Sequence, residues 1–506
     1  MPLINSIISW LNIKRHYQIE LFRKYPFDVQ KEVLHRLLAR AKNTEWGKTY
    51  GYESIKTIED YRERVPLQYY EDIKPMVDRL RQGEENLLWP GEIKWFARSS
   101  GTTNDKSKYI PVSKEALEEC HFRGGKDIIA IHAQNYPETS IMQGKALALG
   151  GSRRINNFSN QSFYGDLSAI LIQNLPFWVS FIKTPSDDIA LLEEWEEKLE
   201  KIYHTTLHEN VTNLAGVPSW TLVLLKYMLE KSGKKNILEI WPNLELFTHG
   251  GVSFIPYRKQ FEMLIPSPDM KYMETYNASE GFFGIQDDLN DNSMLLMLDY
   301  GIFYEFIPME NLSDENPPAK HIGEVETGRN YAMVISTNSG LWRYIIGDTV
   351  VFTSLFPHKI KISGRTKHFI NAFGEELMID NAEKALHIAC EKAAAMIKEY
   401  SACPIYMTND TKGAHEWVIE FEKEPENLAY FSELLDHALM SLNSDYEAKR
   451  YKNITLDPPL VHSVKHGVFY EWFNKRGKLG GQNKVPRLSN SRKYVEELLD
   501  IHRKLA

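Results

Sequence analysis

Apolar residues recur at helical spacing in several places along the first hundred residues of the chain. Residues 4–42 follow the period of an amphipathic helix, and Pro26 interrupts the run, so we expect two helices there. Two shorter stretches, 60–64 and 70–82, show the same spacing and predict two further helices. The N-terminal part is therefore expected to be mainly helical.

Strand-like and helix-like segments alternate over the next 160 residues or so. Runs of apolar and β-branched residues predict strands on both sides of a polar loop near residue 100, and buried strands at 146–149 and 244–248. Helical spacing predicts helices at 113–133, 189–203 and 222–229. This alternation is typical of an α/β fold, in which binding sites lie at the loops that follow the strands.

Composition and charge narrow the function classes. The chain has 506 residues, of which 43% are hydrophobic and 25% are charged, and its net charge is −8. This balance is typical of a soluble globular protein and argues against a general nucleic-acid binder, which would carry a basic surplus. No stretch reaches the roughly 18 uninterrupted apolar residues of a membrane span. We therefore expect neither a nucleic acid nor a membrane as partner.

Cysteine use and the N-terminus indicate the compartment. The three cysteines, Cys120, Cys390 and Cys403, are far apart and odd in number, so they predict neither a disulfide framework nor a paired-cysteine metal site. Residues 1–13 are mildly apolar, but their basic neighbours follow rather than precede them, the wrong order for a secretory signal. A cytoplasmic location is expected.

A polar loop between two predicted strands is the first candidate for chemistry. Apolar residues precede it at 93–96 and follow it at 109–112. Such a loop can align backbone N–H groups and hydroxyls around an anion, with glycine free to adopt the angles that a tight nest needs. Phosphate is the expected anion, and the alternative is an ordinary polar hairpin loop. The loop places hydroxyl residues on both sides of one glycine: Ser99, Ser100, Gly101, Thr102 and Thr103.

The loop is not a Walker A loop. That motif runs directly into a helix whose N-terminus holds the phosphates. Here the chain leaves through Tyr109-Ile110-Pro111, which cannot open a helix, and Ser113 is the expected cap of the next one.

A second polar stretch follows a predicted strand near residue 275. It offers the aromatic ring of Tyr276, the hydroxyl of Ser279 and the carboxylate of Glu280. A nucleoside triphosphate needs such parts: an aromatic face for the base, a donor for phosphate and an oxygen ligand for Mg²⁺. The alternative is a strand end with a solvent-facing glutamate.

Two later stretches of the sequence are further candidates for a nucleotide-binding site. At Gly347-Asp348, an apolar run ends in what we expect to be a turn, and a carboxylate there can accept both hydroxyl hydrogens of a ribose. Gly364-Arg365 lies between predicted strands and is a candidate hinge, because glycine can absorb a large backbone rotation. The structural alternatives are a common Gly-Asp turn and a basic surface turn.

Taken in this order, the motifs resemble those of the adenylate-forming superfamily, and within it the Gretchen Hagen family of acyl-acid amido synthetases in its shorter bacterial form. The resemblance extends from the Ser99–Thr103 loop to Lys484 near the C-terminus and covers most of the chain. It departs from the family pattern at Asn104-Asp105, where a further glycine is usual, and at Ala278, where serine is frequent.

The resemblance implies an ATP-dependent ligase. A carboxylic acid attacks the α-phosphorus of ATP to give an acyl-adenylate and pyrophosphate, and an amino acid amine then attacks the acyl carbon and releases AMP. It also implies a large N-terminal domain of β-sheets flanked by helices, residues 1–365, and a smaller mobile α+β lid, residues 366–506. A monomer is favoured, although the oligomeric state is left open.

The same resemblance assigns roles residue by residue. The hydroxyl loop is expected to hold the phosphates, Glu280 to bind Mg²⁺ and Lys484 to be the mobile catalytic lysine of the lid, unless it is merely a solvated lysine of a basic loop. Arg343 either fixes the Asp348 turn or contacts phosphate. The remaining nucleotide contacts are expected from Gly250, Gly251, Tyr276, Ser279, Asp348 and Arg365.

Two rival functions stay open at this point. An acyl–coenzyme A ligase shares the adenylation chemistry and differs only in its acceptor. A non-catalytic small-molecule binder on the same fold would bind ligand without turnover. Candidate acyl-pocket residues are Phe122, Val217, Trp220 and Leu224, which are equally good core residues, and Arg123 could meet a second polar group of the acid.

Overall fold

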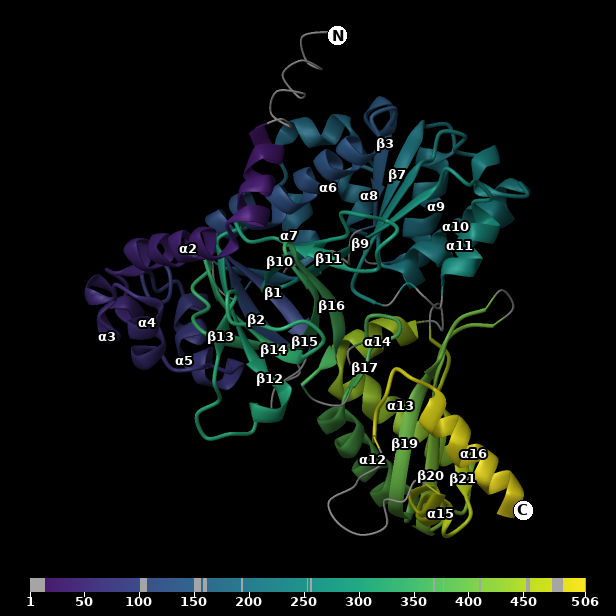
Figure 1. The fold of residues 1–506 in the computed structure, drawn as a ribbon. Coiled ribbons are helices and arrows are strands. Elements are labelled where there is room, and N and C mark those ends of the chain that lie inside the picture. Colours follow the sequence, from purple (N-terminus) through teal and green to yellow (C-terminus); the bar gives the residue numbers. More distant parts are fainter. Residues whose placement is uncertain are drawn as a thin grey trace.

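The computed structural model describes residues 14–100, 107–149, 156–157, 162–192, 194–252, 254, 257–366, 369–375, 377–408, 411–451, 456–475 and 486–505. The larger part of the molecule contains the long sheet and the N-terminal helices (Figure 1). The C-terminal elements gather beside it as a smaller body (Figure 1).

The N-terminal part is helical, as the hydrophobic spacing predicts. One helix includes residues 14–24, and Pro26 is the first residue of the next, where its missing N–H group costs nothing. The buried face of that helix packs against strand β12, and Gln30 donates to the backbone oxygens of Leu298 and Ile302. The helices after the first are α2 (Pro26–Ala41), α3 (Glu45–Thr49), α4 (Ile58–Arg64) and α5 (Tyr70–Arg81).

The main sheet has twelve strands and joins a parallel half to an antiparallel half. Its order is β13-β12-β14-β15-β16-β11-β10-β9-β8-β7-β3-β6. The parallel strands are β3 (Lys145–Ala148), β6 (Lys183–Thr184), β7 (Val211–Gly216), β8 (Leu246–His249) and β9 (Lys271–Ala278). The others are antiparallel: β10 (Gly281–Ile285), β11 (Met294–Leu296), β12 (Ile302–Pro308), β13 (Lys320–His321), β14 (Asn330–Thr337), β15 (Tyr344–Leu355) and β16 (His358–Arg365).

A second, four-stranded sheet carries the hydroxyl loop. Its order is β2-β1-β5-β4, with β1 and β2 antiparallel and β1 and β5 parallel. This agrees with the strands expected on both sides of the loop. Ser113 caps the following helical segment, because its Oγ accepts from the Ala116 N–H at 3.0 Å. The elements are β1 (Trp95–Ser100), β2 (Ser107–Val112), β4 (Asn156–Asn157), β5 (Phe163–Gly165), a π-helical turn (Ala116–His121) and α6 (Phe122–Asn135).

One predicted helix is broken in the structure. The expected helix at 189–203 is two helices, α8 (Asp187–Ala190) and α9 (Trp195–Thr206). The Glu194 side chain accepts the Glu197 N–H and so begins a new helix at Trp195. Spacing alone missed this cap. The other helices here are α7 (Leu167–Gln173), α10 (Pro218–Ser232) and α11 (Arg258–Leu264).

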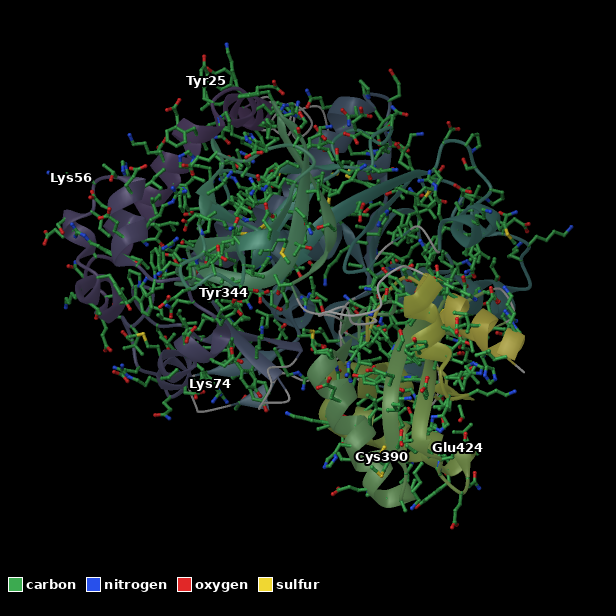
Figure 2. The ribbon with its side chains drawn as sticks, turned by 60° about the horizontal axis from the view of Figure 1, so that its bottom comes forward. Tyr25, Lys56, Lys74, Tyr344, Cys390 and Glu424 are labelled. Atoms are coloured by element: carbon green, nitrogen blue, oxygen red, sulfur yellow. The ribbon has the colours of Figure 1, made fainter. Side chains whose placement is uncertain are left out.

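The C-terminal body combines a three-stranded sheet, β19-β20-β21, with five helices within the described residues. Figure 2 labels Cys390 and Glu424 in this body, well apart from Tyr344 in the main sheet. Its elements are β17 (Phe369–Ile370), β18 (Leu377–Met378), α12 (Ile379–Ala393), β19 (Met396–Ile405), β20 (Ala414–Lys423), α13 (Leu428–Leu442), α14 (Ser444–Arg450), β21 (Leu460–Val464), α15 (Val468–Lys475) and α16 (Lys493–Leu505).

The C-terminal body docks on the region of α10 and α11. One hydrophobic cluster includes buried residues from both sides, such as Phe261 and Phe373. The Tyr257 hydroxyl donates to the Ala372 carbonyl at 2.7 Å. The expected boundary after residue 365 coincides with the end of β16, but the domain division stays a prediction. Among the described helices, none is long and apolar enough to cross a membrane.

Candidate active site

The carboxyl ends of the parallel strands place the candidate nucleotide-binding segments at one edge of the main sheet. Gly250 and Gly251 follow β8, and the Ser279-Glu280 turn follows the neighbouring strand β9. A Cβ atom at Gly250 would lie 2.5 Å from the Thr275 carbonyl oxygen, so only glycine fits so close to β9. Gly251 has φ +82°, which also favours glycine. The edge therefore presents bare backbone, which suits the close approach of a flat ligand.

Three of the predicted site residues meet in one hydrogen-bonded cluster. The Tyr276 hydroxyl donates to Asp348 Oδ2 at 2.5 Å, and Arg365 Nε donates to Asp348 Oδ1 at 2.7 Å. Tyr276 is only 5% exposed, and burial, followed by the Asp348 charge, raises its pKa well above the ordinary value. The phenol is therefore a permanent donor to Asp348 at neutral pH. These residues come from three strands: β9, β15 and β16.

Asp348 does not lie in a turn, as the sequence had suggested. It lies within β15, directly opposite Arg365 of β16. Gly347 has φ +93°, and the register of β14 with β15 shifts between Ala332 and Val334. Such an irregularity in a strand redirects a side chain. The apolar run continues as strand β15 through Asp348 because β14 and β16, its two neighbours in the sheet, both pair with it.

The Asp348 carboxylate keeps acceptor capacity for a ligand. An ionised carboxylate offers about four lone-pair sites, of which Tyr276 and Arg365 occupy one on each oxygen. Its side chain is 13% exposed, so the remaining positions are accessible. Arg365 Nη1 also lies 4.0 Å from Met378 Sδ, which joins the cluster to the start of the C-terminal body.

Glu280 lies at the same end of the sheet. Its charge contributes to raising the pKa of both Tyr276 and Tyr344, after the dominant effect of burial, so both phenols are near it. The Tyr344 hydroxyl is buried and has no hydrogen-bond partner among the described residues. Tyr344 gives no functional signal in the sequence, because an aromatic residue in an apolar strand is typical of a protein core.

The hydroxyl loop is described only at its first residues. Ser99 and Ser100 end β1 and pair with Lys108 and Ser107 of β2. Gly101, Thr102 and Thr103 lie outside the described residues, as does the predicted catalytic Lys484. Their roles stay predictions.

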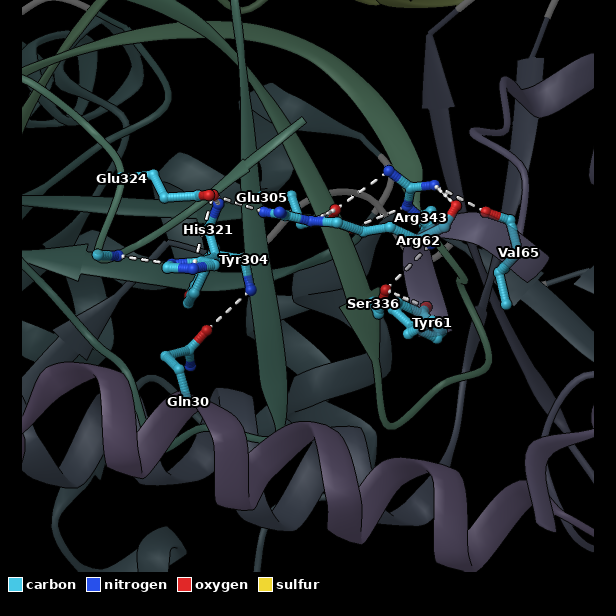
Figure 3. Close-up of polar contacts among 11 residues, drawn as sticks. Gln30, Tyr61, Arg62, Val65, Tyr304, Glu305, His321, Glu324, Ser336 and Arg343 are labelled. Atoms are coloured by element: carbon cyan, nitrogen blue, oxygen red, sulfur yellow. Dashed lines mark hydrogen bonds and ion pairs between the residues drawn. The ribbon is translucent and has the colours of Figure 1, made fainter. Parts of the chain in front are cut away.

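Arg343 has a structural role, and a phosphate contact is not supported. Its Nε and Nη2 donate to the two carboxylate oxygens of Glu305 at 2.9 and 3.1 Å. Its Nη1 donates to the backbone oxygens of Arg62 and Val65 (Figure 3). Glu305 is 1% exposed and Arg343 6%, so the pair is buried. With these contacts its guanidinium ties the segment after α4 to the main sheet.

Two further polar residues, the candidate Arg123 and the nearby His121, bond to neighbouring residues of the protein. Arg123 donates to the Asp299 carbonyl at 2.9 Å, and His121 Nδ1 lies 3.1 Å from Asn277 Oδ1, next to Tyr276. Burial lowers the pKa of His121 to about 4 and that of His249 to about 3, so both are neutral at pH 7. Of the candidate acyl-pocket residues, Leu224 is fully buried core. Within the described part of the chain, no group of three or more His, Cys, Asp or Glu side chains could hold a metal ion.

Comparison with known proteins identifies the family. The sequence matches the GH3 family N-terminal domain over residues 15–270, the central domain over 295–365 and the C-terminal domain over 380–493. The chain belongs to the GH3 family. This confirms the Gretchen Hagen resemblance, since GH3 denotes that family.

The similar curated proteins align along nearly the whole chain. An indole-3-acetic acid-amido synthetase, GH3.3, of Arabidopsis thaliana is 24% identical over 95% of this chain and 92% of its own length. A jasmonoyl–L-amino acid synthetase, GH3.5, of Oryza sativa subsp. japonica is 24% identical over 94% of each chain. A 4-substituted benzoates–glutamate ligase, GH3.12, of Arabidopsis thaliana is 23% identical over 93% of this chain and 94% of its own.

Solved structures confirm the fold class. The acyl acid amido synthetase AtGH3.15 in complex with 2,4-DB aligns with a TM-score of 0.61 at 18% identity, covering 94% of this chain and 93% of that one. A 2-hydroxyisobutyryl-CoA ligase in complex with 2-HIB-AMP and CoA aligns with a TM-score of 0.59 at 12% identity, covering 94% and 92%. The GH3 fold and a CoA ligase fold are thus both similar to this one.

Proposed function

We propose that this protein is an ATP-dependent acyl-acid amido synthetase, a ligase that forms a C–N bond through an acyl-adenylate. Membership in the GH3 family carries the proposal, because three differently named relatives that align over more than 90% of the chain are amide-forming ligases. The substrates are a carboxylic acid, ATP and an amino acid. We make no choice among acids, although the relatives' names point to aryl, indolyl and jasmonate-like ones.

The geometry of the site supports ATP as the activating substrate. Asp348, held by Tyr276 and Arg365, keeps lone pairs for the ribose hydroxyls. Gly250 and Gly251 offer a backbone edge beside them for the base, and we propose that Tyr276 packs near the adenine. Ser279 and the loop Ser99–Thr103 supply donors to the phosphates. Gly250, Gly251 and Ser279 follow the carboxyl ends of β8 and β9, where ligands bind in α/β folds.

We further propose that Glu280 holds Mg²⁺ with the phosphate oxygens. A carboxylate and phosphates are the usual ligands of this ion, and Glu280 lies in the turn that follows Tyr276. Bound there, Mg²⁺ would screen phosphate charge during attack by an anionic carboxylate.

The first half-reaction brings two anions together, so the site must supply positive charge and orientation. The acid's carboxylate oxygen forms a bond to the α-phosphorus as the bond to pyrophosphate breaks. We propose that Lys484, in the C-terminal part of the sequence, neutralises the developing charge. A lysine is a compact cation on a flexible stem and suits this task. In the second half-reaction the amine forms the amide bond and AMP leaves with the electron pair of the acyl–oxygen bond.

The rival function differs in the acceptor. A CoA ligase has a similar fold, but at 12% identity that likeness concerns the fold alone. The deciding experiment incubates the protein with ATP, Mg²⁺ and a panel of carboxylic acids, and adds either amino acids or coenzyme A. AMP release that requires an amino acid and yields an amide supports the proposal. A thioester with coenzyme A in place of an amide would overturn it. A cytosolic location and a monomeric state remain predictions.

A further inference from the structure

Two adjacent basic residues of α14 differ in their surroundings. Arg450 donates to Asp436 at 2.8 and 2.6 Å and to the Leu456 carbonyl at 2.8 Å, so it holds the C-terminal body together. Lys449 instead places its Nζ 4.7 Å from the ring centroid of Trp220, which lies on α10 in the larger part of the molecule. Lys449 therefore lies across the contact between the two parts.

The Lys449 ammonium lies close to the glycine edge of the candidate site. A Cβ atom at Gly374 would be 3.6 Å from its Nζ. Gly374 belongs to a loop whose Asn371 side chain donates to the Gly251 carbonyl at 3.3 Å. On the other side, Trp220 follows Val217, whose side chain would lie 3.5 Å from a Cβ at Gly251. The loop that holds Gly374 and the start of the helix that holds Trp220 thus both contact Gly251, through Asn371 and Val217.

The Lys449 ammonium has no close counter-charge within the described residues. The Lys449 carbonyl accepts from the Leu456 N–H at 3.2 Å, but no ion pair or hydrogen bond to the ammonium is found in that part of the chain. Burial lowers its pKa, and Asp445, Asp166 and Glu375 act in the opposite direction more weakly. Burying an ammonium without a hydrogen-bonded anion is costly, and the Trp220 ring offsets only part of that cost.

Two of these three carboxylates, Glu375 and Asp166, are engaged by other groups. Glu375 accepts from the backbone N–H groups of Ala372 and Phe373 at 3.1 and 2.7 Å and lies 2.8 Å from His415 Nε2. Asp166 lies 3.7 Å from the Arg98 guanidinium. An anion that enters between the two parts would therefore find Lys449 available as its charge partner.

We propose that Lys449 binds the α-carboxylate of the amino acid acceptor, with Trp220 as a wall of the same subsite. The inference rests on the proposed function and extends it to the acceptor. The Asp348 cluster and the phosphate loop address only ATP, which leaves the acid and the amino acid to be bound elsewhere. The acid's carboxylate is consumed when the acyl-adenylate forms, whereas the α-carboxylate of the amino acid stays an anion throughout and therefore needs a charge partner. An ammonium next to an aromatic face provides charge for the carboxylate and apolar surface for the rest of the molecule.

The test compares Lys449→Met and Lys449→Arg with wild type. Lys392→Met is the matched control, because Lys392 is an exposed lysine of α12 in the same part of the chain. Acid-dependent ATP–pyrophosphate exchange without any amine measures the first half-reaction. The kcat/KM for the best of the twenty common amino acids, and for its α-carboxamide, measures the second.

We expect Lys449→Met to leave pyrophosphate exchange within about twofold of wild type and to lower kcat/KM for the amino acid about 10- to 100-fold, as for loss of a charged hydrogen bond. The carboxamide should be used equally poorly by wild type and variant. Lys449→Arg should recover part of the activity, and Lys392→Met should match wild type.

Four outcomes would overturn the inference. Unchanged amino acid kinetics in Lys449→Met would exclude a role in acceptor binding. An equal loss with the carboxamide would exclude the carboxylate as its target. Loss of exchange in a variant with wild-type circular dichroism would instead place Lys449 at a phosphate. No exchange in the wild type with any acid would contradict the proposed function itself, and the inference with it.

Discussion

The hydrogen bond from Tyr276 to Asp348 provides a direct test of the proposed ribose site. Tyr276→Phe removes one hydroxyl and keeps the buried ring, which packs edge-on against Phe283 at 4.8 Å. A hydrogen bond to a charged acceptor contributes about 1.5–3 kcal/mol. Asp348 keeps Arg365 at 2.7 Å and is 13% exposed, so water can replace the lost donor. We therefore expect the Tyr276→Phe substitution to cost an amount at the lower end of this range, about 1.5 kcal/mol.

That loss should appear in nucleotide binding, because the donor orients the carboxylate that receives the ribose. An effect of about 1.4 kcal/mol corresponds to a tenfold higher KM for ATP in pyrophosphate exchange. Tyr304→Phe is the control. Tyr304 is also buried, but its hydroxyl donates to the neutral Met297 carbonyl at 3.1 Å. Its loss should lower the free energy of unfolding by about 1 kcal/mol and leave the KM for ATP unchanged.

Urea unfolding and pyrophosphate-exchange kinetics, measured on both variants, show whether Tyr276 acts on ATP binding or only on stability. An unchanged KM for ATP in Tyr276→Phe would refute the assignment of Asp348 as a ribose acceptor positioned by Tyr276. Equal KM increases in both variants would show a general effect of core tyrosines rather than a local one.

Further predictions follow from the same contacts. Arg343→Met leaves Glu305 as a buried carboxylate without its main partner, so it should lower the free energy of unfolding in urea by about 3–5 kcal/mol. The KM for ATP of the folded protein should not change. A raised KM for ATP in a variant of full stability would instead indicate a phosphate contact. Folding lowers the pKa of His121 from 6.5 to about 4, so the unfolded state binds this proton more readily than the folded state. As pH falls from 6.5 to about 4, the free energy of unfolding should therefore decrease by about 3 kcal/mol. His121→Gln should show a shallower decline over this range by acid titration of circular dichroism, and an identical slope would contradict the neutral, buried imidazole. Glu280→Gln should raise the Mg²⁺ concentration needed for half-maximal exchange without altering the fold, whereas a wild-type Mg²⁺ dependence would exclude it as the metal ligand.

Local sequence patterns predicted the segments of the fold well where each element is specified by its own residues. Helical spacing with a break at Pro26 matches the N-terminal helices, and apolar runs around a polar loop match β1 and β2. The order of the motifs also indicated the family, because spacing along the chain survives at about 24% identity.

What local patterns missed depends on pairing between distant segments. Asp348 looked like a turn residue, but β14 and β16 pair with it from both sides and extend the strand. For Arg343 the sequence left a turn-fixing role and a phosphate contact open, and its buried partner Glu305 could not be predicted because it lies 38 residues away in the sequence. Lys449 gave no signal at all, since its position over Trp220 exists only when the C-terminal body docks on α10.

The central claim is that this chain adenylates a carboxylic acid. The most direct measurement is acid-dependent ATP–pyrophosphate exchange without an amine, across aryl, indolyl, jasmonate-like and fatty acids, in wild type and in Asp348→Ala. We predict exchange with one class of acid in the wild type and its loss in a folded Asp348→Ala protein. No exchange with any acid, in wild-type protein that binds ATP, would contradict the claim and favour a binding protein without turnover.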